Sequence, residues 1–380
     1  MHIIFLTHEY PKKGLNGGGV GSFVQFLSKE LVKNNIQVSV IGVNNLYINE
    51  KEEDCGVKIY RIEKSKWKVG RFYQNAKRIL KKINELDKLN KVDIIEGSEL
   101  SFAFFPKKTT YKKLIRLHGG HHFFAIELGK KPTFWRGYQE KKSFDKAEAY
   151  IAVSNYVGEK TQQYLKYNFH YVTIYNSVDI TKFKEPSNSL VKKNSLLFIG
   201  TVCEKKGVRQ LVQAMPIVKE QIPDVTLNIV GRDWKFPNGK SYIDYLKTFI
   251  PNAMEDSINV IGPVPHSEIP SYIEKASVCV YPSHMEAMPI AWLEGLLMEK
   301  ATVVGDIGPA KEAVIDKVTA LVANPYSPKD IAEKIIFLIE NPEMANLIRI
   351  AARKDILKRF NPNEVSQKNI KFYQTLISNK

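Results

Sequence analysis

Short apolar runs alternate with amphipathic helical patterns along almost the whole chain, and this alternation restricts the fold more than any other feature. Such alternation favours parallel sheets whose strands are joined by right-handed crossovers. The expected strands are His2–Thr7, Gln37–Val43, Val57–Ile62, Asp93–Glu96, Lys113–His118, Tyr150–Val153, Ser195–Gly200, Thr226–Gly231, Ile258–Gly262, Ser277–Tyr281, Ala301–Gly305 and Ala320–Val322. The expected helices include Ser22–Asn34, Val208–Glu220, Ile269–Lys275 and Pro328–Glu340. The sequence therefore predicts an α/β fold with doubly wound sheets.

The pattern restarts near Ser195, after the polar stretch FKEPSNSLVKKNS. A chain of 380 residues also exceeds one ordinary domain. We expect a first domain over residues 1–185 and a second over 195–360, facing each other across a cleft. Residues 361–380 form a last helix that we expect to pack back on the first domain. Ligands should bind at the carboxyl ends of the strands.

Positive charge is concentrated in the first half of the chain. The net charge is +16, and residues 1–190 hold 32 Lys and Arg against 19 Asp and Glu. The segment Lys64–Asn84 contains eight basic residues and no acidic one, interleaved with Trp67, Phe72, Tyr73, Ile79, Leu80 and Ile83. Two interpretations stay open: Lys64–Lys82 meets an anionic membrane surface, or it is a solvated helix whose aliphatic residues are core. No recognition motif for nucleic acid accompanies the charge, so no nucleic-acid partner is expected.

Other bulk features indicate a cytoplasmic protein, either free or bound peripherally to the inner face of the membrane. No apolar run approaches the ~18 residues that span a bilayer. The start MHIIFLTHEYP fits a first strand better than a signal peptide. Three widely spaced cysteines, Cys55, Cys203 and Cys279, fit reduced thiols better than a disulfide framework.

Two glutamates, Glu286 and Glu294, lie in YPSHMEAMPIAWLEGL between an expected strand and a helix. Pro289 suits a helix start, and the free N–H groups of that first turn form an anion site together with the helix dipole. Glu286 would lie beside the anion, and Glu294 about two turns along. An anion site with two carboxylates for hydroxyl groups fits a nucleotide-sugar, although glutamates at this spacing also occur on solvated helix faces.

A glycine-rich loop, GLNGGGVGSFVQFL, follows the first expected strand. Gly17, Gly18, Gly19 and Gly21 allow a ligand to approach the backbone at the start of a helix. Ser22 occupies the last position of a G-x-G-x-x-G pattern, so a nicotinamide cofactor is disfavoured, and no cofactor is expected. A flexible turn without function is the alternative.

Two further strand ends carry polar side chains. In FIGTVCEKKG, Lys206 precedes a helix, a poor position for a cation unless it meets phosphate; a solvent-exposed lysine is the alternative. In LHGGHH, His118 could bind a sugar hydroxyl. A metal is disfavoured there because the H-E-x-x-H pattern and a suitably spaced carboxylate are both missing. No Asp-x-Asp pair occurs, so Lys206 and the helix N-terminus would have to neutralise a diphosphate.

Nine segments occur in an order that carries a family resemblance: GGGVG, RLHGG, AVSNYV, YNSVDITKF, FIGTVCEKKG, NIVGRD, VIGPVPHSEIPSYIEKASVCVYPSHMEAMPIAWLEGL, GDIGPAKEAV and RFNPNEVSQ. In these segments the chain resembles the retaining, GT-B-fold glycosyltransferases of family four (glycosyltransferases group 1). The resemblance covers nearly the whole chain. It implies two Rossmann-like domains, an acceptor-binding one first and a donor-binding one second, and a role in cell-surface polysaccharide or glycolipid assembly.

The resemblance also implies residue roles. Glu286, His118 and Lys206 would be catalytic, with Glu286 on the donor sugar, His118 beside it and Lys206 on the diphosphate. Glu294 would bind the ribose, and the Gly262–Val264 loop the base. The remaining donor-binding residues would be Gly18, Gly19, Gly21, Gly200, Thr201, Lys205, Arg232, Val264, Met288, Pro289 and Ile290.

One position departs from the family pattern. Members usually carry an arginine after the glycine of FIG, where this chain has Thr201. Loss of one cation from a desolvated phosphate clamp costs a few kcal/mol of transition-state stabilisation. Lys205 or Arg232 is expected to compensate, or turnover is slow.

The predicted reaction moves a sugar from a nucleoside diphosphate to a hydroxyl of a carbohydrate or lipid-linked acceptor, keeping the anomeric configuration and using no metal. Two alternatives stay open. One is a nucleotide-sugar epimerase on the same fold, and the other is a catalytically degenerate protein that binds sugar or nucleic acid.

Overall fold

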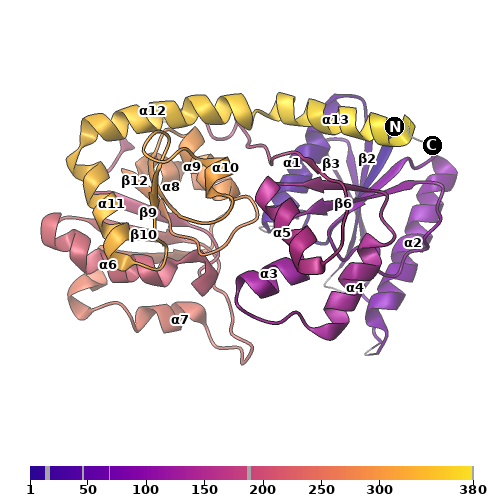
Figure 1. Cartoon of the computed structure of the whole chain (residues 1–380), viewed down its shortest axis with the longest axis horizontal. Helices are drawn as coiled ribbons and strands as arrows, with labels where there is room; N and C mark the ends of the chain where they lie inside the picture. Colours follow the sequence, from indigo (N-terminus) through magenta and orange to yellow (C-terminus); the bar gives the residue numbers. More distant parts are fainter. Residues whose placement is uncertain (13–17, 45–46, 68, 186–189, 379–380) are drawn as a thin grey trace. The chain divides into compact units, whose positions relative to one another are not determined.

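The computed structural model describes residues 1–12, 18–44, 47–67, 69–185 and 190–378. The chain forms two units (Figure 1). Unit 1 consists of Met1–Ser177 and Pro362–Lys380, and unit 2 of Val178–Asn361. Residues 178–185, which the sequence assigned to the first domain, therefore belong to unit 2. The middle of the expected linker, residues 186–189, lies outside the described residues.

Unit 1 is built on an eight-stranded sheet with the order β3-β4-β2-β1-β5-β6-β7-β8. Every neighbouring pair is parallel except β3 with β4. The strands are β1 (His2–Leu6), β2 (Gln37–Val43), β3 (Glu50–Asp54), β4 (Val57–Ile62), β5 (Ile94–Gly97), β6 (Lys112–Leu117), β7 (Ala149–Ala152) and β8 (Val172–Thr173). The continuous burial of the central strands agrees with a sheet covered on both faces.

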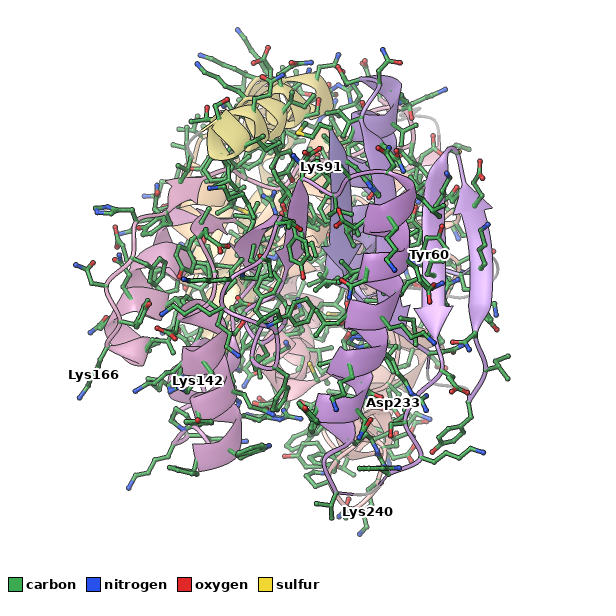
Figure 2. All side chains as sticks on the ribbon, turned by 90° about the vertical axis from the view of Figure 1, so that its right-hand side faces the viewer. Tyr60, Lys91, Lys142, Lys166, Asp233 and Lys240 are labelled. Carbon is green, nitrogen blue, oxygen red and sulfur yellow. The ribbon has the colours of Figure 1, made fainter. Side chains whose placement is uncertain are left out.

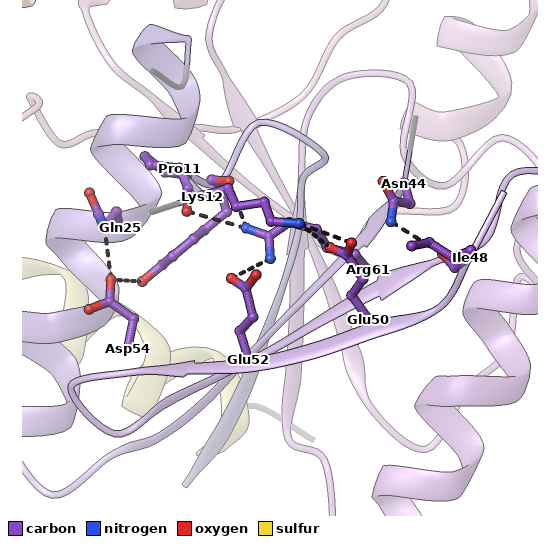
Figure 3. Close-up of polar contacts among 10 residues, drawn as sticks. Pro11, Lys12, Gln25, Asn44, Ile48, Glu50, Glu52, Asp54 and Arg61 are labelled. Atoms are coloured by element: carbon purple, nitrogen blue, oxygen red, sulfur yellow. Dashed lines mark hydrogen bonds and ion pairs between the residues drawn. The ribbon is translucent and has the colours of Figure 1, made fainter. Parts of the chain in front are cut away.

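The edge strand β3 was not predicted, because its sequence EKEED has no apolar residue. Its three alternate acids instead meet cations and hydroxyls from other elements (Figure 3). Glu50 pairs with Lys12 at 2.9 Å, Glu52 with Arg61 at 2.6 Å and Asp54 with Lys29 at 2.9 Å. The two-residue turn Cys55–Gly56 has positive φ at both positions, 51° and 83°, as a tight antiparallel hairpin requires. The expectation of a purely parallel sheet is therefore wrong at this edge.

Five helices lie between the strands of unit 1 along the described chain, and a sixth, α13, follows unit 2. They are α1 (Gly19–Lys33), α2 (Arg71–Leu89), α3 (His121–Glu127), α4 (Phe134–Phe144), α5 (Asn155–Leu165) and α13 (Pro362–Ser378). The last helix, α13, packs on α1 although more than 300 residues separate them, and Gln367 donates to Asn34 at 3.0 Å. Within the described residues, no helix is long and apolar enough to cross a bilayer.

Unit 2 is built on a six-stranded parallel sheet with the order β11-β10-β9-β12-β13-β14. The strands are β9 (Ser195–Ile199), β10 (Thr226–Val230), β11 (Ile258–Gly262), β12 (Val278–Tyr281), β13 (Ala301–Gly305) and β14 (Leu321–Ala323). The chain winds outward from β9 to β11 and then returns to place β12 on the other side of β9. The sheet therefore has a topological switch point between β9 and β12.

The helices of unit 2 are α6 (Val208–Gln221), α7 (Tyr242–Lys247), α8 (Ile269–Lys275), α9 (Ile290–Leu297), α10 (Ala310–Ala313), α11 (Pro328–Glu340) and α12 (Pro342–Arg359), with short 3-10 turns at Glu204–Lys206 and Asn252–Ser257. Helices α6 and α11 pack together over one face of the sheet, and Val212, Met215 and Ile335 lie in that buried core. The prediction of an α/β fold with two doubly wound, Rossmann-like domains is confirmed. That the two domains face each other across a cleft remains a prediction.

A buried charge network joins α13 to the sheet of unit 1. Arg116, on β6, donates to Glu96 at 2.6 Å and to Asn369 at 2.6 Å. The hydroxyl of Tyr373 donates to Glu96 at 2.7 Å. Arg116 is only 1% exposed and Glu96 only 3%. Each charge is thus compensated by the other, and Asn369 and Tyr373 of α13 add hydrogen bonds, while Nη1 of Arg116 is left without a partner among the described residues.

Replacing Arg116 with leucine should therefore destabilise the protein by about 3–5 kcal/mol, because Glu96 would stay buried without its cation. Urea unfolding followed by circular dichroism measures the change. Glu85→Gln, which removes an exposed i,i+3 partner of Lys82 on α2, should have no measurable effect. Equal stability of the two variants would show that the network does not hold α13 in place.

Candidate functional site

The main cluster of predicted site residues lies at the carboxyl edge of the sheet of unit 2. Lys206 ends the 3-10 turn Glu204–Lys206 after β9, and Glu286 lies in the turn after β12. Their side chains form an ion pair, although the residues are 80 positions apart. Ser283 donates from its hydroxyl to the same carboxylate oxygen at 2.9 Å. The switch point thus holds a cation, a carboxylate and a hydroxyl together, where open α/β sheets bind ligands.

Backbone contacts fix the two loops that carry this pair. The amide of His284 donates to the carbonyl of Lys205 at 2.9 Å, which joins the loop after β12 to the loop after β9. Gly207, with φ of +67°, follows Lys206, and a Cβ atom there would lie 1.8 Å from the carbonyl oxygen of Pro282. A larger residue at Gly207 would therefore push the loops apart.

The predicted anion-binding turn has the expected local structure. Pro289 immediately precedes α9, which begins at Ile290. The amides of Trp292 and Leu293 already donate to the carbonyl of Pro289, so the free donors lie at the very start of the helix. Met288 is buried and Ile290 is half-buried. This turn directly follows Glu286, as the sequence indicated.

Glu294, the second glutamate, lies on α9 with its side chain only 8% exposed. One of its oxygens lies 3.1 Å from Nε2 of His266, and Nδ1 of the same ring contacts the ammonium group of Lys182. Burial lowers the pKa of Lys182, while the charges of Glu294 and Asp179 act in the opposite direction. His266 and Lys182 were not predicted as site residues, and their place in the segments VIGPVPHSEIP and YNSVDITKF was the available signal.

The position that departs from the family pattern, Thr201, has a cation beside it. Arg232 donates from Nε to the Thr201 hydroxyl at 3.3 Å. Gly200 and Gly231 bring the two loops this close, because a Cβ atom at Gly231 would lie 1.7 Å from the carbonyl oxygen of Gly200. Val264 belongs to the loop after the neighbouring strand β11. The Gly231 amide donates to the Gly262 carbonyl at 2.9 Å, which joins this loop to the one after β10.

In unit 1, the glycines that open α1 have different neighbours. A Cβ atom at Gly18 would lie 2.1 Å from Glu9 Oε2, and one at Gly21 would lie 1.8 Å from the Glu9 carbonyl oxygen. A Cβ atom at Gly19 would meet no described atom within 4 Å. Close packing against backbone therefore explains Gly21, whereas the Glu9 side chain could move away from a larger residue at Gly18, and no described residue fills the space beside Gly19. Gly17 lies outside the described residues.

His118 follows β6 and packs edge-on against Phe23, with ring centroids 5.3 Å apart. Burial, with a further contribution from Arg116, lowers the pKa of His118 to about 3, so the ring is neutral at physiological pH. A neutral imidazole can exchange hydrogen bonds with a hydroxyl group but supplies no positive charge.

The three histidines of LHGGHH have separate partners. His121 Nε2 accepts from the Thr133 amide at 2.9 Å, whereas His122 contacts Glu140, which also accepts from the His122 amide at 2.9 Å. Across the described part of the chain, no group of three or more His, Cys, Asp or Glu residues gathers as a metal site.

Two buried carboxylates beside His118 were not predicted. Glu99 is 2% exposed and Glu140 is fully buried, and each has one oxygen that no described residue bonds. Both lie next to Gly120, where a Cβ atom would meet Glu140 Oε1 at 1.8 Å and Glu99 Cγ at 2.9 Å. Burial raises the pKa of Glu99 to about 8, and the Glu140 charge adds to the effect. The position of Glu99 just after a buried strand was the available signal.

Two family models match the chain. The model described as Glycosyltransferase Family 4 matches residues 17–182, and the model described as Glycosyl transferases group 1 matches residues 179–355. An uncharacterized glycosyltransferase of Methanocaldococcus jannaschii is 26% identical over 242 residues, which are 64% of this chain and 62% of the relative. The chain thus spans slightly less than two thirds of that relative's length.

Solved structures agree with this result. Sucrose-phosphate synthase from Thermosynechococcus elongatus matches with a TM-score of 0.83 at 16% identity, over 100% of both chains. Anabaena HepE in complex with UDP and glucose matches with a TM-score of 0.78 at 17% identity, over 99% of this chain and 100% of that one. These likenesses show the fold, which is that of the GT-B glycosyltransferases. The chain belongs to the group 1, family 4 glycosyltransferases.

The buried carboxylate Glu99 makes stability depend on pH. Its ordinary pKa is 4.5 and its folded pKa is about 8, so the folded state binds more protons between these values. The contribution of the protonated Glu99 to the free energy of unfolding is fully present below pH 4.5 and is lost as pH rises through 8. Wild type should lose up to roughly 4 kcal/mol over this range, a loss that Glu99→Gln should not show.

Melting temperatures between pH 6.5 and 9 measure the difference. His118 does not affect the comparison in this pH range, because its lowered pKa changes stability only as pH falls from 6.5 towards 3. The exposed Glu159→Gln on α5 should keep the wild-type pH slope. Parallel slopes for Glu99→Gln and wild type would contradict a protonated Glu99.

Proposed function

We propose that this protein transfers a sugar from a nucleoside diphosphate to an acceptor hydroxyl with retention of the anomeric configuration. The ion pair between Lys206 and Glu286 at the switch point of unit 2 carries the proposal. A cation suits the diphosphate, and a neighbouring carboxylate suits the sugar hydroxyls, so one small cluster offers partners for both halves of a donor.

A uridine nucleotide is the first donor to test. Anabaena HepE, which shares the fold, is in complex with UDP and glucose. In this chain Glu294, at the middle of α9, would bind the ribose, and the loop containing Val264 would bind the base. His266 and Lys182 orient the Glu294 carboxylate from the other side.

In the proposed step, the bond between the anomeric carbon and the diphosphate oxygen breaks, and the acceptor hydroxyl oxygen bonds to the same carbon. The acceptor proton passes to the leaving phosphate oxygen. Negative charge grows on the departing diphosphate, where Lys206 and the N-terminus of α9 stabilise it. These fixed groups would supply the neutralisation without a resident metal. Glu286 would hold the sugar while the charge develops.

Arg232 is the proposed replacement for the arginine that the family usually has at the position of Thr201. Its hydrogen bond to the Thr201 hydroxyl holds a guanidinium group beside the position where that arginine would begin. Lys205, in the same loop as Thr201, would add a second positive charge. A guanidinium group suits phosphate oxygens because it donates two parallel bonds.

The acceptor side is assigned to unit 1. Among the described residues, nothing fills the space beside Gly19 at the start of α1, and the neutral ring of His118 can bond a hydroxyl group of the transferred sugar. The proposed acceptor is a carbohydrate or a lipid-linked sugar of the kind used in assembling cell-surface polysaccharide or glycolipid.

Removing either member of the switch-point pair should reduce turnover. Lys206→Met should lower kcat by about 10²–10³-fold, because it removes a charge that stabilises the leaving diphosphate. Glu286→Gln should lower kcat/KM roughly 10- to 100-fold, because it loses a charge-assisted hydrogen bond. The assay follows release of nucleoside diphosphate from UDP-sugars with a panel of lipid-linked and soluble acceptors.

The exposed Lys329→Met on α11 serves as the matched control and should keep wild-type rates. Nuclear magnetic resonance of the product tests retention, and it also distinguishes transfer from epimerisation of the donor. Full turnover by Glu286→Gln would rule out its role on the sugar.

Arg232→Met tests the compensation at Thr201. If Arg232 contacts the diphosphate, the variant should bind UDP about tenfold more weakly, as measured by calorimetry, and its binding should depend less on salt. Thr201→Arg in the Arg232→Met background should restore part of the affinity. Unchanged UDP binding by Arg232→Met would show that another cation serves the phosphates.

A further inference from the structure

Unit 1 exposes an unusual set of aromatic side chains at the N-terminal ends of two helices. Beside α2 they are Trp67 (61% exposed), Phe72 and Tyr73, and beside α4 they are Phe134 (87% exposed), Trp135 and Tyr138; the aliphatic residues Val69 and Leu128 are also exposed there. We call these eight residues the aromatic rim. Exposed apolar groups on this scale mark an interaction site rather than ordinary surface.

The two halves of the rim lie at the same edge of the sheet. Helix α2 leads into β5 and helix α4 into β7, so both helices run against the strands and begin at the carboxyl edge. Both connections move in the same direction along the sheet, so right-handed crossovers place the two helices on one face. Figure 1 labels both helices in unit 1, and Figure 2 labels Lys142 of α4.

The segment after β5 contacts both helices. Phe104 packs edge-on against Tyr73 of α2, with ring centroids 6.0 Å apart. On the other side, the Phe102 amide donates to the hydroxyl of Ser143 on α4 at 2.9 Å. Figure 2 shows this side of unit 1 facing the viewer. The segment after β5 therefore bridges the two helices, with its contact on α4 at the buried C-terminal end of that helix.

Among the described residues, the charges that border the rim are mostly basic; Glu127, next to Leu128, is half-buried and accepts from the hydroxyls of Tyr156 and Tyr164. The exposed cations beside it are Lys66, Lys77, Lys81, Lys130, Lys131, Arg136, Lys141 and Lys142. The segment Lys64–Asn84 contains no acid, and between Leu128 and Lys142 the single acid, Glu140, is buried. Lys77 lies 4.7 Å from the centre of the Tyr73 ring, and Lys142 lies 5.7 Å from that of Tyr138. Aromatic side chains interleaved with lysines match the interface of an anionic bilayer.

We propose that the aromatic rim docks unit 1 on an anionic lipid bilayer. Trp67, Phe72, Phe134 and Trp135 enter the boundary between headgroups and acyl chains, and the surrounding lysines bind anionic headgroups. The carboxyl edge of the sheet, with Gly19 and His118, would then lie near the membrane surface, where a lipid-linked acceptor is found. The docking itself does not depend on the proposed transfer reaction.

Flotation with vesicles tests the proposal on the full chain without donor or acceptor. We expect binding to vesicles of phosphatidylcholine with 30% phosphatidylglycerol, and at least tenfold weaker binding to pure phosphatidylcholine. Binding should also fall when salt rises from 0.15 to 1 M. Phe134→Ser/Trp135→Ser should reduce binding at least tenfold, since both aromatic residues leave water on docking.

The structure offers matched controls on the other end of α2. Leu89 is 84% exposed there, and Leu89→Ser should bind vesicles as wild type does. Lys130→Glu/Lys131→Glu should lose binding, whereas Lys88→Glu/Lys91→Glu, with the same change in charge, should keep most of it. Figure 2 labels Lys91 near the C-terminal end of α2. Circular dichroism confirms that each variant is folded.

Tryptophan emission supplies a second measurement. Brominated lipids should quench wild-type emission, and Trp67→Phe/Trp135→Phe should abolish the quenching, since Trp292 is buried and Trp234 belongs to unit 2. Equal losses of binding in the rim and control variants would overturn the proposal. It would also be overturned by retention on an anionic polysaccharide without vesicle binding, or by concentration-dependent dimers that the rim variants abolish.

Discussion

Parallel pairing of β9 with β10 on one side and with β12 on the other is the constraint on which the proposed donor site depends. Parallel strands deliver all their following loops to one edge, and the reversal of winding at β9 opens a space between two of those loops. Lys206 and Glu286 meet there. Three backbone bonds lock the edge: Gly200 to Val230, Gly231 to Gly262, and His284 to Lys205. Main-chain geometry therefore brings the two loops together, and the side chains of Lys206, Glu286 and Ser283 bond to one another between them.

In unit 1, several acidic residues form ion pairs inside the domain. Glu50, Glu52 and Asp54 hold an edge strand that has no apolar residue, and Glu96 neutralises a guanidinium group buried under α13. The surplus of lysine therefore remains at the surface, where it surrounds the aromatic rim. The excess of basic over acidic residues thus has two consequences: the acids of β3 are paired within the domain, and one face of unit 1 is positively charged.

Features that depend on local sequence patterns were predicted, whereas features that depend on contacts between distant segments were missed. Glu286, Pro289 and Ile290 were placed correctly because a strand, a turn and a helix start are local patterns. The strand β3 was missed because its stability comes from Lys12, Lys29 and Arg61, which lie elsewhere in the chain. For the same reason, periodicity could not reveal that Glu99 and Glu140 share the surroundings of Gly120, or that His266 lies between Lys182 and Glu294.

The amino-acid sequence by itself determined most of the order of strands and helices, the restart at β9, the uneven charge and the family, because each of these depends on neighbours along the chain or on ordered motifs. Only the tertiary structure decided which side chains meet. It joined Lys206 to Glu286, placed Arg232 beside Thr201, and divided the basic segment into a buried side at Ile83 and an exposed aromatic end. Such encounters depend on strand order and on close backbone approach, which residue types alone do not encode.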